Sequence, residues 1–170
     1  MFEFRHAKSS DVAGIVRLMQ NTKYAQYIYP GKTFSELKNL VLDSMKIKKY
    51  LVCIDSNKNI HTLVGYFIIL PMTWKLSHLP KGLETSKNFA YHAGVGIHSK
   101  YRGKGLATKL TKYAFKIAKR LGYKGMYADV GSDNESSIKL QEKCGFKEIA
   151  RHKSKLRAKG IKNVVFEIRF

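Results

Sequence analysis

A stretch rich in glycine and positive charge occupies positions 95–107 (Val-Gly-Ile-His-Ser-Lys-Tyr-Arg-Gly-Lys-Gly-Leu-Ala). It begins as an apolar strand and continues through a loop directly into a helix. The first amides of a helix have no acceptor within it, so they are available to bind an anion. Gly103 and Gly105 let the backbone approach such an anion, and Arg102 and Lys104 add positive charge. The stretch therefore indicates diphosphate binding, although a tight turn into an ordinary helix would use the same residues.

The loop matches neither of the two commoner nucleotide-binding motifs. A P-loop carries Lys and then Ser or Thr after its last glycine, whereas Leu106 and Ala107 follow here. The GxGxxG fingerprint of dinucleotide-binding folds is also absent. The diphosphate site, if present, belongs to a different class of protein.

That class is indicated by two motifs. Arg102-x-x-Gly105-x-Ala107 resembles the Q/R-x-x-G-x-G/A signature of the GNAT acetyltransferases. The segment Asn134-x-x-Ser137-x-x-Leu140-x-x-Lys143-x-Gly145-Phe146 is similar to a second motif of that family, at the family's separation. The resemblance runs in order along nearly the whole chain. It implies the GNAT fold, a mixed α/β architecture with a mostly antiparallel sheet of six to seven strands, about four flanking helices, and the fourth and fifth strands splayed.

The resemblance also implies acetyl-CoA as co-substrate, no metal, and transfer of the acetyl group to an amine. The pantetheine arm of acetyl-CoA would pair like an added strand with the backbone of Val95, Gly96 and Ile97. The backbone amides expected to hold the diphosphate are those of Arg102, Gly103, Lys104, Gly105, Leu106 and Ala107. The second motif is expected to contribute Asn134, on the amide region of the arm, together with Ser137 and Gln141.

The acid and base of the reaction do not follow from the motifs. Many relatives carry a Tyr seven residues after the motif's Asn, where it protonates the departing thiolate; here that residue is Gln141, which has no titratable proton. Counting along the strand places Tyr91 where several relatives carry a base, and a bulge near Gly94 or Gly96 would exchange it for His92. His92 has the more suitable ordinary pKa, about 6.5. Alternatively both are structural, and the amine loses its proton through water.

Apolar periodicity predicts the elements that must position these residues. Strands are expected at 2–5, 50–55, 60–70, 89–97, 125–130, 146–152 and 164–170. Helices are expected after an N-cap at Ser10 and Asp11, after the capping box Thr33-x-x-Glu36 through position 47, and at 104–121 and 134–143. Positions 71–88 have no periodicity and are expected to form a long loop. The sequence predicts one domain, 1–170.

The charge is unusual, because 32 Lys and Arg against 12 Asp and Glu give a formal net charge of +20. Such a field attracts polyanions and disfavours cationic acceptors. A phosphate-rich cofactor, RNA or an acidic protein would fit, and so would a lysine-rich surface that serves only solubility. Two alternatives therefore accompany the leading prediction: a non-catalytic acetyl-CoA-binding domain, and an RNA- or ribosome-associated acetyltransferase.

Other features bound the environment of the protein. No apolar run is long enough to span a bilayer, and the first residues lack the apolar core of a secretory signal, so a cytoplasmic protein without membrane contact is expected. Cys53 and Cys144 are not in a metal-ligand spacing and are expected to be buried, reduced thiols. The acceptor amine is not identified by the sequence, and a monomer and a homodimer are both compatible with it.

Overall fold

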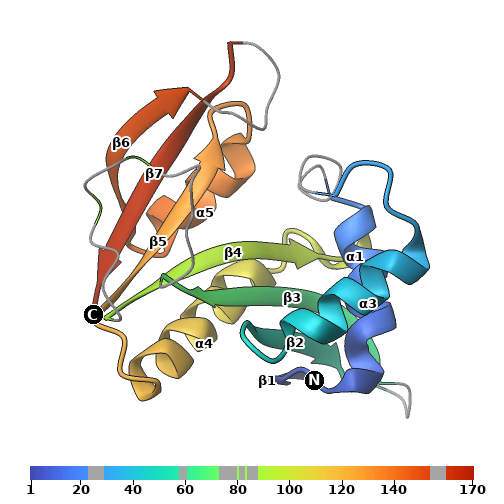
Figure 1. The fold of residues 1–170 in the computed structure, drawn as a ribbon. Coiled ribbons are helices and arrows are strands. Elements are labelled where there is room, and N and C mark those ends of the chain that lie inside the picture. The colour runs from blue at the N-terminus through green and yellow to red at the C-terminus, as the bar shows by residue number, and fades with distance from the viewer. Residues whose placement is uncertain (23–28, 58–60, 73–79, 81–82, 84–87, 154–159) are drawn as a thin grey trace. The chain divides into compact units, whose positions relative to one another are not determined.

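A computed structural model gives the fold of the 170-residue chain (Figure 1). The structure describes residues 1–22, 29–57, 61–72, 80, 83, 88–153 and 160–170. Contacts between residues divide the chain into two compact units. The first comprises Met1–Ile68 and Gly94–Ala114, and the second comprises Ile69–Ala93 and Phe115–Phe170.

The first unit combines antiparallel strands with two helices that pack against each other, α1 and α3 (Figure 1). Its elements are β1 (Phe2–His6), the short 3-10 helix η1 (Ser9–Asp11), α1 (Val12–Gln20), α3 (Phe34–Ser44), β2 (Lys49–Asp55), most of β3 (Thr62–Pro71), the second half of β4 (Phe89–Ile97), the 3-10 helix η2 (Ser99–Tyr101) and the first part of α4 (Leu106–Arg120). β1 pairs with β2 from Phe2↔Asp55 to His6↔Leu51. Its fully buried side chains include Ile15, Met19, Leu51, Tyr66 and Phe67.

The second unit contains the remainder of β3, β4 and α4, followed by four elements. These are β5 (Gly125–Gly131), α5 (Glu135–Lys143), β6 (Lys147–Lys153) and β7 (Lys162–Arg169). β4 and β5 run parallel, whereas β7 is antiparallel to both β5 and β6. The Phe89 and Tyr127 rings stack with centroids 5.0 Å apart, in a core that also holds Met126, Val165 and Phe166.

Hydrogen-bonded strands follow one another in the order β1-β2-β3-β4-β5-β7-β6, which makes a sheet of seven strands. The register between β4 and β5 runs from Phe89↔Gly125 to His92↔Ala128, although β4 continues to Ile97. β5, in contrast, pairs with β7 along its whole length. The described residues also form four α-helices, so the predicted mixed α/β fold class is confirmed.

The capping box predicted at the start of α3 is confirmed. The hydroxyl of Thr33 accepts a hydrogen bond from the Glu36 amide at 3.2 Å, and the Glu36 carboxylate accepts one from the Thr33 amide at 2.8 Å. The helix ends at Ser44 rather than at position 47. The Ser44 hydroxyl donates to the Val41 carbonyl and lies 2.8 Å from the Tyr50 hydroxyl, so the chain turns towards β2.

Two further boundaries differ from the prediction. α4 begins at Leu106, not at position 104, because Gly105 has a left-handed φ of 70° that no α-helical residue adopts. β3 begins at Thr62, whereas the strand was predicted from position 60, which lies outside the described residues. Of the predicted loop, Pro71 is the last residue of β3, whereas 73–79, 81–82 and 84–87 lie outside the described residues.

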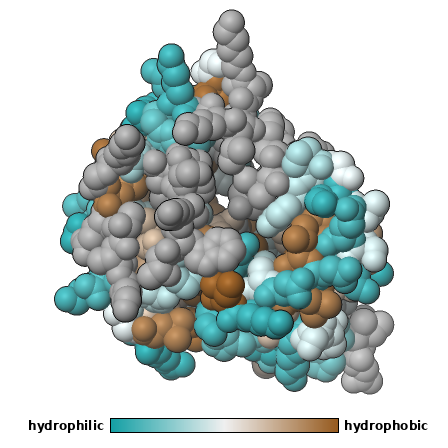
Figure 2. Space-filling model, viewed as in Figure 1, coloured by the Kyte–Doolittle hydropathy of each residue, from teal (hydrophilic) through white to brown (hydrophobic). Residues whose placement is uncertain are grey.

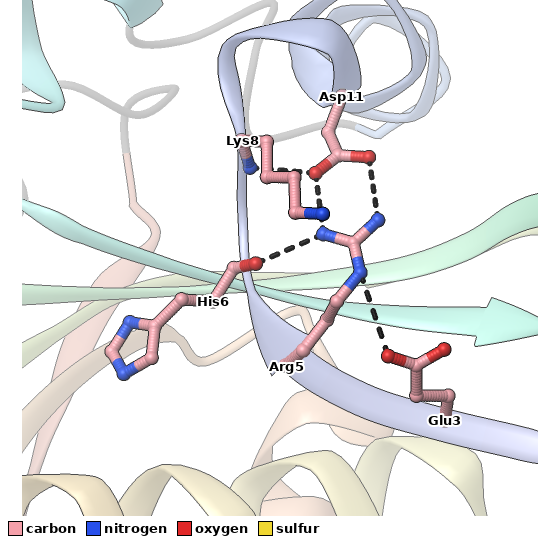
Figure 3. Close-up of polar contacts among 5 residues, drawn as sticks. All are labelled: Glu3, Arg5, His6, Lys8 and Asp11. Carbon is pink, nitrogen blue, oxygen red and sulfur yellow. Dashed lines mark hydrogen bonds and ion pairs between the residues drawn. The ribbon is translucent and has the colours of Figure 1, made fainter.

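Asp11 stands at the start of α1, as predicted, but its carboxylate does not cap that helix. It accepts two hydrogen bonds from the Arg5 guanidinium, at 2.7 and 3.0 Å, and one from the Lys8 amide at 2.7 Å (Figure 3). Burial raises the pKa of Asp11, but the bonds from Arg5 and Lys8 outweigh it and lower the pKa below its usual value. The carboxylate therefore ties β1 to the turn before α1.

Candidate functional site

The glycine loop lies between η2 and α4 in the first unit. Gly103 and Gly105 have φ angles of 77° and 70°, in the left-handed region that favours glycine. A Cβ at either position would meet no atom within 4 Å, so the requirement for glycine comes from the backbone conformation and not from crowding. The two glycines reverse the chain so that the loop leads into the first turn of α4.

The backbone amides of the loop are not equivalent. The Arg102 amide, one of those predicted to bind the anion, donates to the Ser99 carbonyl at 3.2 Å in this structure. Within the described residues, no acceptor is recorded for the amides of Gly103, Lys104 and Gly105. The first amides of α4, at Leu106 and Ala107, have no acceptor within the helix. The candidate anion site therefore narrows to the amides of residues 103–107.

Two cations lie beside this loop. The Arg102 side chain is exposed, and its Nε donates to the Ile97 carbonyl at 3.2 Å, which connects the loop to the end of β4. The exposed Lys104 places its Nζ 5.1 Å from the centroid of the Tyr101 ring. Both positive charges remain in contact with solvent.

Tyr101 and Asp55 are components of the loop's support that the sequence analysis missed. The Tyr101 hydroxyl donates to Asp55 Oδ2 at 3.0 Å, and the Tyr101 ring meets Phe2 edge-on with centroids 6.1 Å apart. His98, which has no assigned role in the sequence analysis, caps η2 by accepting a hydrogen bond from the Lys100 amide at 3.3 Å. The only sequence signal was that Tyr101 immediately precedes the Arg-Gly-Lys-Gly of the motif.

The three residues predicted beside the pantetheine arm lie at the end of β4. Val95 and Ile97 are half-buried, and Gly96 is buried. A Cβ on Gly96 would collide with the Tyr66 ring, so this glycine is required for packing between β3 and β4, whatever the strand binds. The His98 amide donates to the Val64 carbonyl at 2.8 Å, which extends the β3 contact beyond Ile97.

Asn134 and Ser137 lie at the start of α5 in the second unit. Asn134 is the N-cap of the helix, and its side-chain oxygen accepts hydrogen bonds from the Ser137 amide at 3.2 Å and from the Ser136 hydroxyl at 3.0 Å. That oxygen is therefore engaged in capping, and the side-chain NH2 of Asn134 is the group that remains for a ligand. Ser137 is half-buried.

Gln141 and His92 meet in the second unit. Gln141 Nε2 lies 3.3 Å from His92 Nδ1, and both residues are buried. Burial lowers the pKa of His92 to about 4 and outweighs the contact with Gln141. Burial therefore removes the reason for which the sequence favoured His92 over Tyr91 as a base, its ordinary pKa of about 6.5. A buried imidazole is costly to charge.

Tyr91 precedes His92 on β4 and pairs with Tyr127 of β5 in a continuous register. No register shift is recorded between Phe89 and His92. The side chains of Tyr91 and His92 therefore point to opposite faces of the sheet. The structure thus brings His92 and Gln141 together, and it places residues 95–107 in the first unit with Asn134, Ser137 and Gln141 in the second.

Cys53 and Cys144 are buried and form no disulfide, as predicted, and burial raises the pKa of Cys53 to about 11. Among the described residues, no group of three or more His, Cys, Asp or Glu side chains could hold a metal ion. In that same part of the chain, no helix is long and apolar enough to cross a membrane.

Solved structures from several bacteria share this architecture. The yncA protein of Salmonella typhimurium, solved with acetyl-CoA, is 20% identical with a TM-score of 0.75, covering 99% of this chain and 93% of its own. An N-acetyltransferase from Staphylococcus aureus has a TM-score of 0.76 at 20% identity, covering 99% and 98%. Spermidine N-acetyltransferase from Vibrio cholerae, solved with CoA and spermine, also has a TM-score of 0.76 at 20% identity, covering 99% and 95%. At these identities the similarity shows a common fold.

The family follows from the sequence itself. The family model described as "Acetyltransferase (GNAT) family" matches residues 15–146, and the chain belongs to that family. Among curated proteins, it is 22% identical over 145 residues to N-alpha-acetyltransferase 30 of Schizosaccharomyces pombe, covering 84% of this chain and 80% of that one. Residues 15–146, which match the family model, include both the glycine loop and α5.

Proposed function

We propose that this protein transfers an acetyl group from acetyl-CoA to a primary amine by direct attack. The amine nitrogen forms a bond to the thioester carbonyl carbon, the carbon–sulfur bond breaks, and CoA leaves as a thiolate. The amine's surplus proton goes to a base or to water, and the thiolate takes up a proton. None of these steps requires a metal.

The observation that carries this proposal is the conformation of the glycine loop. Left-handed Gly103 and Gly105 precede the first turn of α4, and the amides of 103–107 have no recorded acceptor in the described part of the chain. Such a set of amides, flanked by Arg102 and Lys104, suits the diphosphate of acetyl-CoA. On this proposal Val95, Gly96 and Ile97 contact the pantetheine arm, and Asn134 uses its side-chain NH2.

The test is a binding measurement followed by an acceptor screen. Acetyl-CoA should raise the melting temperature of the purified protein by mass action. Released thiol should then appear with at least one amine from a panel containing spermidine, a peptide with a free N-terminus and a peptide with an internal lysine. Binding without thiol release from any amine would favour the non-catalytic alternative, and no binding would overturn the proposal.

A second candidate, an RNA-associated acetyltransferase, has a specific observation in its favour. α4 contains no acidic residue but carries five exposed cations, Lys109, Lys112, Lys116, Lys119 and Arg120. No ion pair to any of the five is recorded among the described residues. Figure 2 shows hydrophilic residues over much of the described surface on the face viewed. Lysines without a neighbouring acid attract the phosphate backbone of RNA. This second candidate has the same fold as the first and differs from it only in the acceptor.

A further inference from the structure

β3 and β4 interlock in the first unit, where each strand has a glycine beneath a large side chain of the other. A Cβ on Gly96 of β4 would collide with the Tyr66 ring of β3. A Cβ on Gly65 of β3 would lie 2.6 Å from Cδ1 of Ile97 on β4. Side chains of successive strand residues point to opposite faces of a sheet, so the two contacts lie on opposite faces. These four residues are called the β3–β4 interlock below.

The Tyr66 ring is the part of the interlock that cannot yield. Tyr66 is 1% exposed, and its hydroxyl forms a hydrogen bond with the side chain of Thr22. The Thr22 hydroxyl in turn donates to the Met19 carbonyl, in the last turn of α1, at 2.6 Å. The ring is therefore held by the packed core around it and at its hydroxyl end. Ile97, in contrast, meets Gly65 with the end of a flexible, half-buried side chain, which can rotate away.

The interlock lies on the part of β4 that extends beyond its register with β5. That register ends at His92, whereas β4 continues to Ile97. Just after the strand, the His98 amide donates to the Val64 carbonyl of β3 at 2.8 Å. Among the described residues, β3 is therefore the strand recorded beside residues 93–97.

The peptide groups of this stretch alternate in direction. Because the His98 amide points to β3, the peptide groups of Gly96 point there too, and those of Val95 and Ile97 point away from β3. The Ile97 carbonyl agrees with this alternation, since it accepts its hydrogen bond from Arg102 Nε at 3.2 Å. Val95 and Ile97 thus form the open peptide edge that the proposed function assigns to the pantetheine arm.

We infer that Tyr66 is a positioning residue for acetyl-CoA, because its ring, seated on Gly96, holds the peptide edge of Val95 and Ile97 in place beyond the register with β5. This inference deepens the proposed acetyl transfer and rests on it for its functional meaning. Without the ring, this part of β4 can shift against β3. Binding of the arm would then have to order the edge, which lowers the affinity.

Hydrogen exchange tests the interlock in the free protein, without any ligand. Tyr66→Leu removes the ring. Phe67→Leu is the matched control, because Phe67 is the next residue of β3, is fully buried and points to the opposite face. The His98 amide should exchange about tenfold faster in Tyr66→Leu than in Phe67→Leu. Equal exchange in two variants of equal stability in urea would overturn the inference. Tyr66→Met is the substitute should Tyr66→Leu fail to fold.

A double-mutant cycle on acetyl-CoA affinity, measured by calorimetry, tests the contact with Gly96. The φ of Gly96 is not positive, so Gly96→Ala adds a methyl group that meets the ring but no backbone strain. Gly96→Ala should weaken binding about tenfold in the wild-type background, and less than about threefold in Tyr66→Leu, where the methyl group has room. An equal loss in both backgrounds would show that the methyl group acts on the ligand directly, and would overturn the role of Tyr66.

Tyr66→Phe separates the ring from the hydroxyl, because it keeps the contact with Gly96 and loses the bond to Thr22. Its affinity for acetyl-CoA should stay within about twofold of the wild-type value, whereas Tyr66→Leu should bind about tenfold more weakly. An equal loss in the two variants would assign the effect to the hydroxyl and contradict the role of the ring.

With an acceptor in hand, kinetics separate this inference from the proposed function. Tyr66→Leu should raise the KM for acetyl-CoA about tenfold and lower kcat less than about threefold. A fall in kcat at unchanged KM would contradict a positioning role towards acetyl-CoA. Absence of acetyl-CoA binding by the wild-type protein would instead overturn the proposed function, while the exchange measurement would still decide whether the Tyr66 ring holds β4 against β3.

Discussion

The Tyr101 hydroxyl donates a hydrogen bond to Asp55 across 46 residues of sequence, at 3.0 Å. Tyr101 ends η2, immediately before the glycine loop, and Asp55 ends β2. The turn that leads into the loop is therefore attached to a strand of the sheet through a side chain. The edge-on contact between the rings of Tyr101 and Phe2 adds a second attachment, to β1.

Removing this bond should weaken cofactor binding without changing the chemical step. Tyr101→Phe keeps the ring but loses this hydrogen bond to a carboxylate, so the KM for acetyl-CoA should rise about fivefold. We expect kcat to change less than about twofold. Steady-state kinetics with acetyl-CoA varied is the measurement, and Tyr113→Phe on α4 is the matched control. A fall in kcat at unchanged KM would contradict the anchoring role.

Gly105→Glu should abolish the rise in melting temperature that acetyl-CoA produces. A side chain at φ 70° is strained by about 1–2 kcal/mol, and the added carboxylate repels the diphosphate. Gly122→Glu is the matched control, because Gly122 also has a positive φ and open space around it but follows the end of α4. Both variants should lose similar stability. If Gly105→Glu kept the full shift, the loop would not be the diphosphate site.

The buried His92 predicts a specific loss of stability in mild acid. Its pKa is about 4 in the folded protein and about 6.5 in an unfolded chain, so only the unfolded state takes up this proton as the pH falls between those values. The stabilisation is complete above pH 6.5 and is lost as the pH falls towards 4. Melting temperatures at pH 7.5, 6 and 5 should therefore fall more steeply for the wild-type protein than for His92→Gln. Parallel curves would show that His92 does not titrate this way.

The Arg5–Asp11 pair should contribute far more stability than an exposed pair. Its side chains are 26% and 10% exposed and share two hydrogen bonds, whereas those of Lys32 and Glu36 are 44% and 48% exposed. Arg5→Ala leaves the Asp11 carboxylate without its main partner and should lower the free energy of unfolding by about 1–3 kcal/mol. Lys32→Ala should cost about 0.5 kcal/mol or less. Urea denaturation of both variants measures the difference, and equal losses would contradict this ranking.

If α4 contacts RNA, affinity should depend on its lysines and on salt. Reversing Lys112 and Lys116 to Glu should weaken binding of a single-stranded RNA oligonucleotide by about tenfold or more at low salt, and should reduce the slope of log affinity against log salt. Reversing Lys147 and Lys153 of β6 gives a control with the same change in net charge. Binding that is undetectable at low salt, or equally sensitive in both variants, would assign the lysines of α4 to solubility alone.

Local patterns in the sequence determined the parts of the structure that depend on neighbouring residues. The capping box between Thr33 and Glu36 forms as predicted because its two partners are three residues apart on one turn. The glycine motif places its loop correctly because Gly103 and Gly105 supply left-handed backbone angles that other residues rarely adopt. The fold class followed from two motifs at a family's separation and from the apolar periodicity between them.

Only the tertiary structure decided which side chains those elements bring together. Asp11 was expected to cap the helix that it precedes, but Arg5 approaches from β1 and engages its carboxylate instead. The ordinary pKa of His92 favoured it as a base, but burial lowers that pKa. Its contact with Gln141 was not predicted, because a contact across 49 residues leaves no local pattern in the sequence. Hydrogen bonding and desolvation depend on how close groups lie in space. The spacing of residues in the sequence indicates that distance only within a single helical turn or strand.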